Sequence, residues 1–276
     1  MNLRTTTEEV AFAAMETMRE AYLDALPHAQ DALVEALVRD EHTKAWRIAH
    51  RSETMGYFLL RQGQLLELFL RPEYEYFAHR LVPRIVHAHE IRSALVKTFD
   101  ALFLACCLDF AERVEVHGAL SRDYLRRTLP NIPRIRYASR IAEPADLARI
   151  VDVEQDVFTR VDRLEAAVAA GKVLLFERDD ALIGFGLLKP VIAGRPAIEL
   201  GIAVDQAYRN KGYSIYMLRD MAEACFERGL QPVTGCSRRN EPSIRMGVRI
   251  GFVSKYRVIE THFSETSLAN GPDWSP

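Results

Sequence analysis

A basic turn between an apolar strand and an amphipathic helix is the segment of this chain best suited to hold a charged ligand. The residues of this turn are Arg209, Asn210, Lys211, Gly212, Tyr213 and Ser214. A helix that begins there leaves its first backbone N–H groups without partners and carries a partial positive charge at that end. With two cationic side chains beside them, these N–H groups predict a site for a phosphate or pyrophosphate.

The cysteines and histidines do not form a metal-binding pattern. The four cysteines are Cys106, Cys107, Cys225 and Cys236, and no two of them have Cys-x-x-Cys spacing. We expect reduced thiols that pack in the interior. Of the eight histidines, His87 and His89 are two residues apart, so they would point to different faces of a helix. The sequence therefore predicts no metal site.

Length and composition are those of an ordinary globular protein. The 276 residues are enough for two domains, with 49% hydrophobic and 27% charged residues. A net charge of −2 argues against binding to nucleic acid or to a membrane surface. No apolar run approaches the roughly 18 residues of a membrane span, and the start MNLRTTTEEV is not typical of a signal peptide. We expect a cytoplasmic protein.

Hydrophobic periodicity divides the chain into two halves of similar order. In the first half it predicts helices over residues 7–22, 29–38, 78–89 and 91–111. It predicts strands over residues 45–50, 55–61, 65–70 and 114–118. In the second half it predicts strands over residues 172–177, 182–189, 197–204 and 232–236, with a helix over 214–228.

Several short segments of the two halves match in residue class and in order. Residues 55–61 match 183–189, and residues 66–70 match 198–202, which aligns Glu67 with Glu199. Two later matches, at 110–113 with 225–228 and at Gly118 with Gly235, follow in the same order. We infer a tandem duplication.

The expected domain boundary lies where two prolines and an asparagine occur, at residues 129–133. We predict domains over residues 1–130 and 134–264, followed by a disordered tail over 265–276. The halves differ at the turn: residues 71–80 contain no glycine and carry Glu73 and Glu75, which would repel a polyphosphate. We expect the first half to bind no nucleotide cofactor.

The second half resembles the GNAT superfamily, the general control-related N-acetyltransferases. The family's Arg/Gln-x-x-Gly-x-Gly/Ala motif matches residues 209–214, with Ser214 in the last position. Residues 240–252 match its later Asn-x-x-Ser…Gly-Phe segment, and residues 135–147 match its first strand and helix. The resemblance implies an α/β (α+β) fold of two tandem GNAT-like domains. Each would have a mixed, mainly antiparallel central sheet flanked by helices, and the first domain would be degenerate.

The resemblance also implies where acyl-CoA would bind. The strand end would bond the pantetheine arm through its backbone, and its residues are Ile202, Ala203 and Val204. Backbone N–H groups over residues 209–214 would hold the pyrophosphate, helped by Arg209 and Lys211. Asn240 would contact the pantetheine arm or order a water.

The expected proton-transfer groups depart from the family's pattern. The tyrosine that many members place seven residues after the asparagine is Gly247 here. Ser243 or a water is the substitute we predict as the acid, and Tyr213 and Tyr256 are weaker substitutes. Glu199 is the predicted base. A structural role for Glu199 stays open, because the first half also has a glutamate at the aligned position.

The sequence thus predicts an acyl-CoA-dependent N-acyltransferase that moves acetyl from acetyl-CoA to a primary amine by direct attack. Two alternatives stay open, a non-catalytic CoA sensor and a transferase of a longer acyl group. The expected acceptor is a small-molecule amine, with a protein amine as an alternative. We expect a monomer or a weak homodimer.

Overall fold

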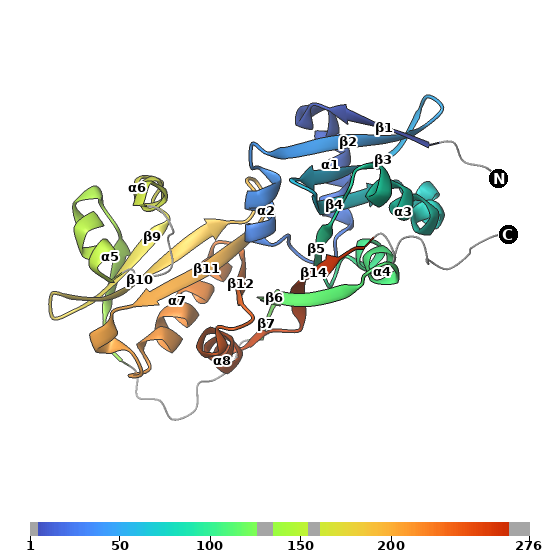
Figure 1. Ribbon diagram of the computed structural model, residues 1–276. Coiled ribbons are helices and arrows are strands. Elements are labelled where there is room, and N and C mark those ends of the chain that lie inside the picture. Colours follow the sequence, from blue (N-terminus) through green and yellow to red (C-terminus); the bar gives the residue numbers. More distant parts are fainter. Residues whose placement is uncertain (1–4, 126–134, 154–160, 265–276) are drawn as a thin grey trace. The chain divides into compact units, whose positions relative to one another are not determined.

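The computed structural model describes residues 5–125, 135–153 and 161–264, and the chain divides into two compact units (Figure 1). Unit 1 consists of Met1–Gly118 together with Tyr256–Pro276, and unit 2 of Ala119–Lys255. The predicted boundary at residues 129–133 lies outside the described residues. The two units divide the chain at other points than the predicted domains do, and the last strand of the chain belongs to unit 1.

Unit 1 contains a mixed, mainly antiparallel sheet. Its strands, in spatial order, are β1 (Thr5–Val10), β2 (Thr43–His50), β3 (Glu53–Arg61), β4 (Gln64–Leu70), β5 (Ser93–Lys97) and β14 (Tyr256–His262). Only the pairing of β4 with β5 is parallel. The helices of unit 1 are η1 (Phe12–Met15), α1 (Glu16–Ala25), α2 (Ala32–Val38), η2 (Pro72–Phe77), α3 (Ala78–Ala88) and α4 (Ala101–Asp109). Strand β6 (Arg113–Ser121) leads from unit 1 into unit 2.

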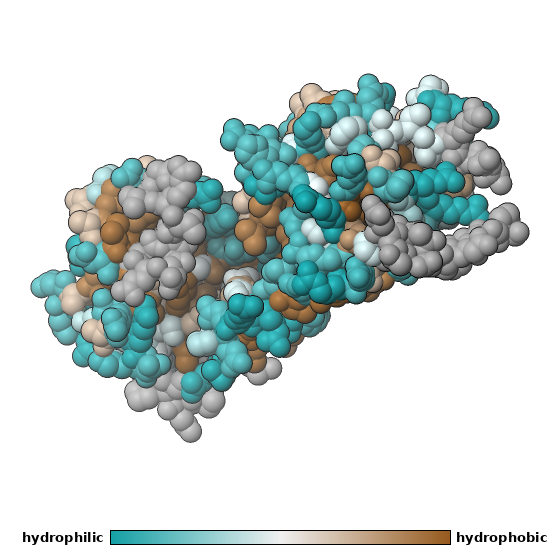
Figure 2. All heavy atoms as spheres, viewed as in Figure 1, coloured by the Kyte–Doolittle hydropathy of each residue, from teal (hydrophilic) through white to brown (hydrophobic). Residues whose placement is uncertain are grey.

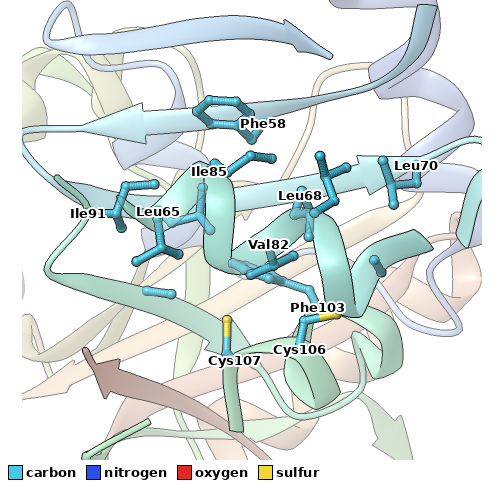
Figure 3. Packing of buried hydrophobic residues seen from close by; sticks show 14 of the residues in the cluster. Phe58, Leu65, Leu68, Leu70, Val82, Ile85, Ile91, Phe103, Cys106 and Cys107 are labelled. Carbon is cyan, nitrogen blue, oxygen red and sulfur yellow. The ribbon is translucent and has the colours of Figure 1, made fainter. Parts of the chain in front are cut away.

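One face of this sheet packs against α3 and α4. Alternate residues of the strands, such as Leu68 and Leu70, meet the buried faces of the two helices. Figure 3 shows Val82 and Ile85 of α3 and Phe103 of α4 among these strand residues. Cys106 and Cys107 also belong to this core, and burial raises the pKa of the Cys106 thiol to about 12. They pack as apolar residues, in agreement with the prediction.

Unit 2 has the same kind of sheet. Its strands, in spatial order, are β12 (Gln231–Ser237), β11 (Ala197–Val204), β10 (Ala181–Pro190), β9 (Val173–Arg178) and β8 (Ala138–Ile141). Again one pairing is parallel, that of β11 with β12. A separate two-stranded sheet pairs β7 (Asp123–Tyr124) with β13 (Phe252–Val253). The helices of unit 2 are η3 (Pro144–Asp146), α5 (Leu147–Val153), α6 (Val161–Ala169), η4 (Gln206–Tyr208), α7 (Tyr213–Glu227) and α8 (Glu241–Ile250).

Helices flank both faces of the sheet in unit 2 (Figure 1). Helix α7 packs Leu218, Met221 and Cys225 against the face that presents Ile198 and Leu200. Helices α5 and α6 cover the opposite face, which carries Phe185 and Leu175. The predicted fold class, with mainly antiparallel sheets flanked by helices, is confirmed.

Two predicted helices of the first half are wrong in part. Residues 5–10 form an edge strand, β1, because Thr5, Thr6 and Thr7 favour an extended backbone that pairs with β2, and the helix starts only at Glu16. Residues 91–111 form β5 and then α4 rather than one helix. A short, wholly buried strand such as β5 has no alternation of apolar and polar residues, so its pattern resembles that of a helix.

The strand register supports the duplication and corrects the alignment of Glu67. Gly56 lies opposite Leu70, as Gly184 lies opposite Val204, and a Cβ at either glycine would overlap a carbonyl of the neighbouring strand. Counted from these pairs, Glu67 corresponds to Gly201 and not to Glu199. The predicted equivalence is therefore wrong by two residues, because short runs of apolar residues match one another at more than one register.

The surface mixes polar and apolar residues. Figure 2 shows hydrophilic residues over much of the visible face of each unit, with hydrophobic residues between them. Within the described ranges, no helix has the length and apolar character that a membrane span requires.

Candidate acyl-CoA site

The carboxyl end of β11 is open on the side of β12. The two parallel strands pair only from Ala197 to Glu199, so the rest of β11 continues without that neighbour. The Asp205 N–H donates to the Ile183 carbonyl (2.8 Å). Since N–H groups alternate in direction along a strand, those of the odd-numbered residues of β11 point toward β10. The N–H groups of Ile202 and Val204 therefore face the gap, where an extended ligand can bond to them.

The turn after β11 is shaped by two residues in the left-handed region. Asn210 has φ 59° and Gly212 has φ 85°. Positive φ on either side of Lys211 gathers successive N–H groups on one side of the backbone, and such a concavity binds anions. Helix α7 starts directly afterwards, and no side chain of the described residues caps its first turn. The corresponding stretch of unit 1, residues 71–78, contains no residue with positive φ.

These elements line a cavity of about 740 Å³. Its wall is formed by the end of β11, the turn, the start of α7 and the first turns of α8. Three arginines, Arg209, Arg245 and Arg249, lie in the wall, and none of its described residues is an aspartate or glutamate. A cavity with cationic side chains and free backbone N–H groups suits a ligand with several phosphate charges.

Most of the predicted cofactor residues line this cavity. They are Ile202, Ala203, Val204, Arg209, Asn210, Gly212, Tyr213, Ser214 and Asn240. Lys211 does not line it; its ammonium lies 5.7 Å from the centre of the Tyr208 ring. Arg209 is anchored at the strand end, because its Nε donates to the Val204 carbonyl (2.9 Å).

Asn240 is the N-cap of α8. Its side-chain oxygen accepts from the Ser243 N–H (3.2 Å), while its own N–H donates to the Ser237 carbonyl (2.9 Å). The spacing of three residues between Asn240 and Ser243 is therefore that of a helix cap. Both residues also line the cavity, so the cap holds the Asn240 amide and the Ser243 hydroxyl at its wall.

Both parts of the chain match the same superfamily in sequence. Residues 142–252 match the family described as "Acetyltransferase (GNAT) family", and residues 12–124 match "Acetyltransferase (GNAT) domain". The chain contains two GNAT domains in tandem. GNAT domains are the domains of acyl-CoA-dependent N-acetyltransferases. A comparison with curated proteins found no match.

Solved structures of GNAT proteins share the fold over nearly the whole chain. A GNAT-family acetyltransferase from Colwellia psychrerythraea is 17% identical, with a TM-score of 0.81 and coverage of 94% of this chain and 100% of that one. A tandem GNAT protein from the clavulanic acid biosynthesis pathway is 14% identical, with a TM-score of 0.55 and coverage of 94% and 98%. At these identities the likeness shows the fold.

The predicted proton-transfer groups of the GNAT site are not all at the cavity. Ser243 lines it, but Glu199 does not. On β11, the Glu199 side chain lies on the other face of the sheet from Leu200 and Ile202. Its pairing partner on the neighbouring strand β10 is Lys189. The role of Glu199 as a base stays a prediction.

The weaker tyrosine substitutes have structural partners. The Tyr213 hydroxyl accepts from Arg178 (3.0 Å), and this contact raises the pKa of Arg178. Tyr256 belongs to unit 1, where its hydroxyl contacts His28. Of the two, only Tyr213 lines the cavity.

Sequence reasoning missed the arginines of α8. Arg245 and Arg249 are four residues apart, so they lie on one face of the helix, and both line the cavity. The sequence could have predicted them. Asn240 caps the helix and so fixes where it begins, and the spacing from the cap then shows that both arginines lie on one face of it.

Proposed function

We propose that unit 2 binds acyl-CoA in the 740 Å³ cavity and transfers an acetyl group to a primary amine. The observation that carries the proposal is this wall, which joins an open strand end, a turn suited to anions and three arginines, of which Arg245 also pairs with Glu241 (3.5 Å). CoA can use each of these features, because the amides of its pantetheine arm can bond to the strand end, and its phosphates to the turn and the arginines.

Each part of the donor has a partner in the site. The pyrophosphate accepts from the N–H groups of residues 210–214 and from Arg209. Arg245 and Arg249 provide positive charge for a further phosphate. The pantetheine amides pair with the free N–H and carbonyl groups of β11, which leaves the thioester near Ile202. An N–H of the strand there can polarise the thioester carbonyl.

The reaction is a direct attack in a ternary complex. The amine nitrogen bonds to the carbonyl carbon, the carbon–sulfur bond breaks, and the amine proton passes to a base. The CoA thiolate receives a proton and leaves as the thiol. Glu199 or a water serves as the base and Ser243 or a water as the acid. The acceptor is a small-molecule amine, and unit 1 contributes no cofactor site.

Binding and turnover of the full-length chain test this proposal. Isothermal titration should show CoA binding that Arg209→Ala weakens about tenfold, because one charge-assisted contact is lost. Arg71→Ala is the matched control: Arg71 follows β4 as the turn follows β11, and it pairs with Glu53 and Glu73 on the surface of unit 1. This control should bind CoA as the natural chain does.

Thiol release from acetyl-CoA with a panel of primary amines then separates the functions. Release that depends on an amine supports the transferase. Binding of CoA without release for any amine would favour a non-catalytic sensor, for which the missing tyrosine at Gly247 is the motivating observation. An absence of CoA binding would overturn the proposal.

A further inference from the structure

The strand that enters unit 2 from unit 1 borders the candidate site. Residues 119–122, the end of β6 and the residue after it, belong to unit 2 and are all buried. In sequence they precede the second predicted domain, which begins at residue 134. In the sheet, β6 is the neighbour of β12 on the side away from β11. This segment therefore lies beside the strand that parts from β11.

Arg122 holds β12 at the point where it leaves β11. Arg122 is only 1% exposed, and its Nη1 donates to the Thr234 carbonyl (3.0 Å). The Arg122 carbonyl accepts from the Gln231 side-chain amide (3.3 Å). These two bonds grip β12 at both ends of residues 231–234, and the last residue of β12 that pairs with β11 is Val233.

The backbone direction of β12 shows what this grip does. The Gln231 N–H donates to the Pro196 carbonyl (2.9 Å), so the N–H and C=O groups of odd-numbered residues of β12 point toward β11. Those of even-numbered residues point toward β6, where Pro232 has no N–H to donate. The Thr234 carbonyl also points toward β6, and the Arg122 guanidinium holds it there.

Without this grip, β12 could continue along β11. The register of Glu199 with Val233, if it continued, would place Gly201 opposite Gly235. In such a parallel pair the N–H of Ile202 would donate to the Gly235 carbonyl. That N–H faces the gap, and it is available to a ligand only while the two strands stay apart.

We propose that Arg122 is a positioning residue for acyl-CoA, which holds β12 toward β6 and so keeps the Ile202 N–H open to the ligand. The inference rests on the proposed function, because it takes the pantetheine arm to bond to β11. Arg122 does not line the 740 Å³ cavity, so it acts through β12 and not on the donor.

Hydrogen exchange of the full-length chain without ligand tests this role directly. Arg122→Met should slow exchange of the Ile202 N–H at least about tenfold, because an amide that bonds within a sheet exchanges only when the strands open. A role in stability alone predicts the opposite, faster exchange on both strands. Arg122→Lys, which can still donate one bond to the Thr234 carbonyl, should exchange like the natural chain.

Titration with CoA gives the second readout. Arg122→Met should raise Kd about fivefold, the effect of one lost hydrogen bond. Arg19→Met is the matched control: it removes an equally buried arginine from unit 1 and should leave Kd unchanged. Gln231→Ala removes the bond to the Arg122 carbonyl from an exposed position, so it should move both readouts in the same direction, by less. This variant decides the question if Arg122→Met does not fold.

Exchange of the Ile202 N–H that is unchanged or faster in these variants would overturn the positioning role. An unchanged Kd despite slower exchange would overturn it as well, because the Ile202 N–H would then not serve the ligand. If exchange slows but the natural chain binds no CoA, the grip of Arg122 on β12 stands and the proposed function fails.

Discussion

Asn240 serves α8 as a cap and faces the cavity at the same time. Its side-chain oxygen accepts from the Ser243 N–H, which leaves the amide NH₂ as the group that can donate to a ligand. The family resemblance predicted only the contact with the ligand, and the structure adds the cap. The two roles use different atoms, so two substitutions can separate them.

We predict that Asn240→Asp keeps the cap and weakens CoA binding. A carboxylate accepts the Ser243 N–H as the amide does, so the free energy of unfolding should stay within about 0.5 kcal/mol of the natural chain. It cannot donate to the ligand and repels phosphate, so Kd for CoA should rise at least about fivefold. Asn240→Ala, which loses both groups, should in addition destabilise the chain by about 1 kcal/mol. Unchanged CoA affinity in Asn240→Asp would reduce Asn240 to a cap.

At the scale of elements, an ionic cluster joins strand β8 of unit 2 to the helix after it. Arg140 of β8 donates to both carboxylate oxygens of Asp146, at 2.7 Å each. The Glu143 N–H donates to the same carboxylate (2.9 Å), which completes a capping box. The hydrogen bonds from Arg140, followed by that from Glu143, hold the pKa of Asp146 at about 2.

The lowered pKa predicts a loss of stability in acid. A carboxylate that titrates lower in the folded chain than in the unfolded chain stabilises the fold above pH 4, and this contribution is lost as the pH falls from 4 to 2. Asp146→Asn should lower the free energy of unfolding by about 2 kcal/mol at pH 7, and the deficit should shrink toward pH 2.

Urea unfolding at pH 7, 4 and 2.5 measures this effect. The matched control is Asp152→Asn, which removes the same charge from an exposed position of α5. The control should unfold like the natural chain at each pH. An equal deficit of Asp146→Asn at all three pH values would contradict the assignment.

At the scale of the whole molecule, the two GNAT units use the same region of the sheet differently. In unit 1, Glu67 of β4 is fully buried and accepts from Arg19 (3.0 and 2.9 Å), Gln30 (2.9 Å) and Tyr57 (3.1 Å). Arg19 also donates to Glu35 of α2. Such a network, satisfied by its own side chains, stabilises the unit and occupies the acceptor positions of the Glu67 carboxylate, two hydrogen bonds on each oxygen.

We predict one CoA per full-length chain and a structural role for Arg19. Arg19→Met leaves the buried Glu67 carboxylate without its cation, while Glu35 keeps its pair with Arg39 (3.0 Å), and should destabilise the chain by about 3–5 kcal/mol. Titration below the unfolding temperature should still give one CoA per chain, because the site lies in unit 2. Arg47→Met, which removes a surface ion pair with Glu8, is the control and should change stability by less than about 1 kcal/mol. A stoichiometry of two would contradict the assignment of unit 1.

Local patterns were sufficient for much of the second half. The strands over 172–177 and 197–204, the helix over 214–228 and the turn between them are where the sequence predicts them. Each is set by contacts within a few residues along the chain or by simple alternation, and these are visible in one sequence. Residues 7–10 and 93–97 were predicted as helix, because their strand state depends on pairing with distant segments.

The sequence by itself determined that the chain has two GNAT-like parts and a basic glycine turn between a strand and a helix, because residue order is enough to specify a helix start, a glycine turn and a strand. Only the tertiary structure decided that β14 completes the sheet of unit 1, that Glu67 corresponds to Gly201, and that Lys211 and Glu199 lie off the cavity wall. The register of two strands, the point where they separate and the face to which a side chain points all depend on which strands pair. They come from contacts between residues far apart in the chain, which no local pattern records.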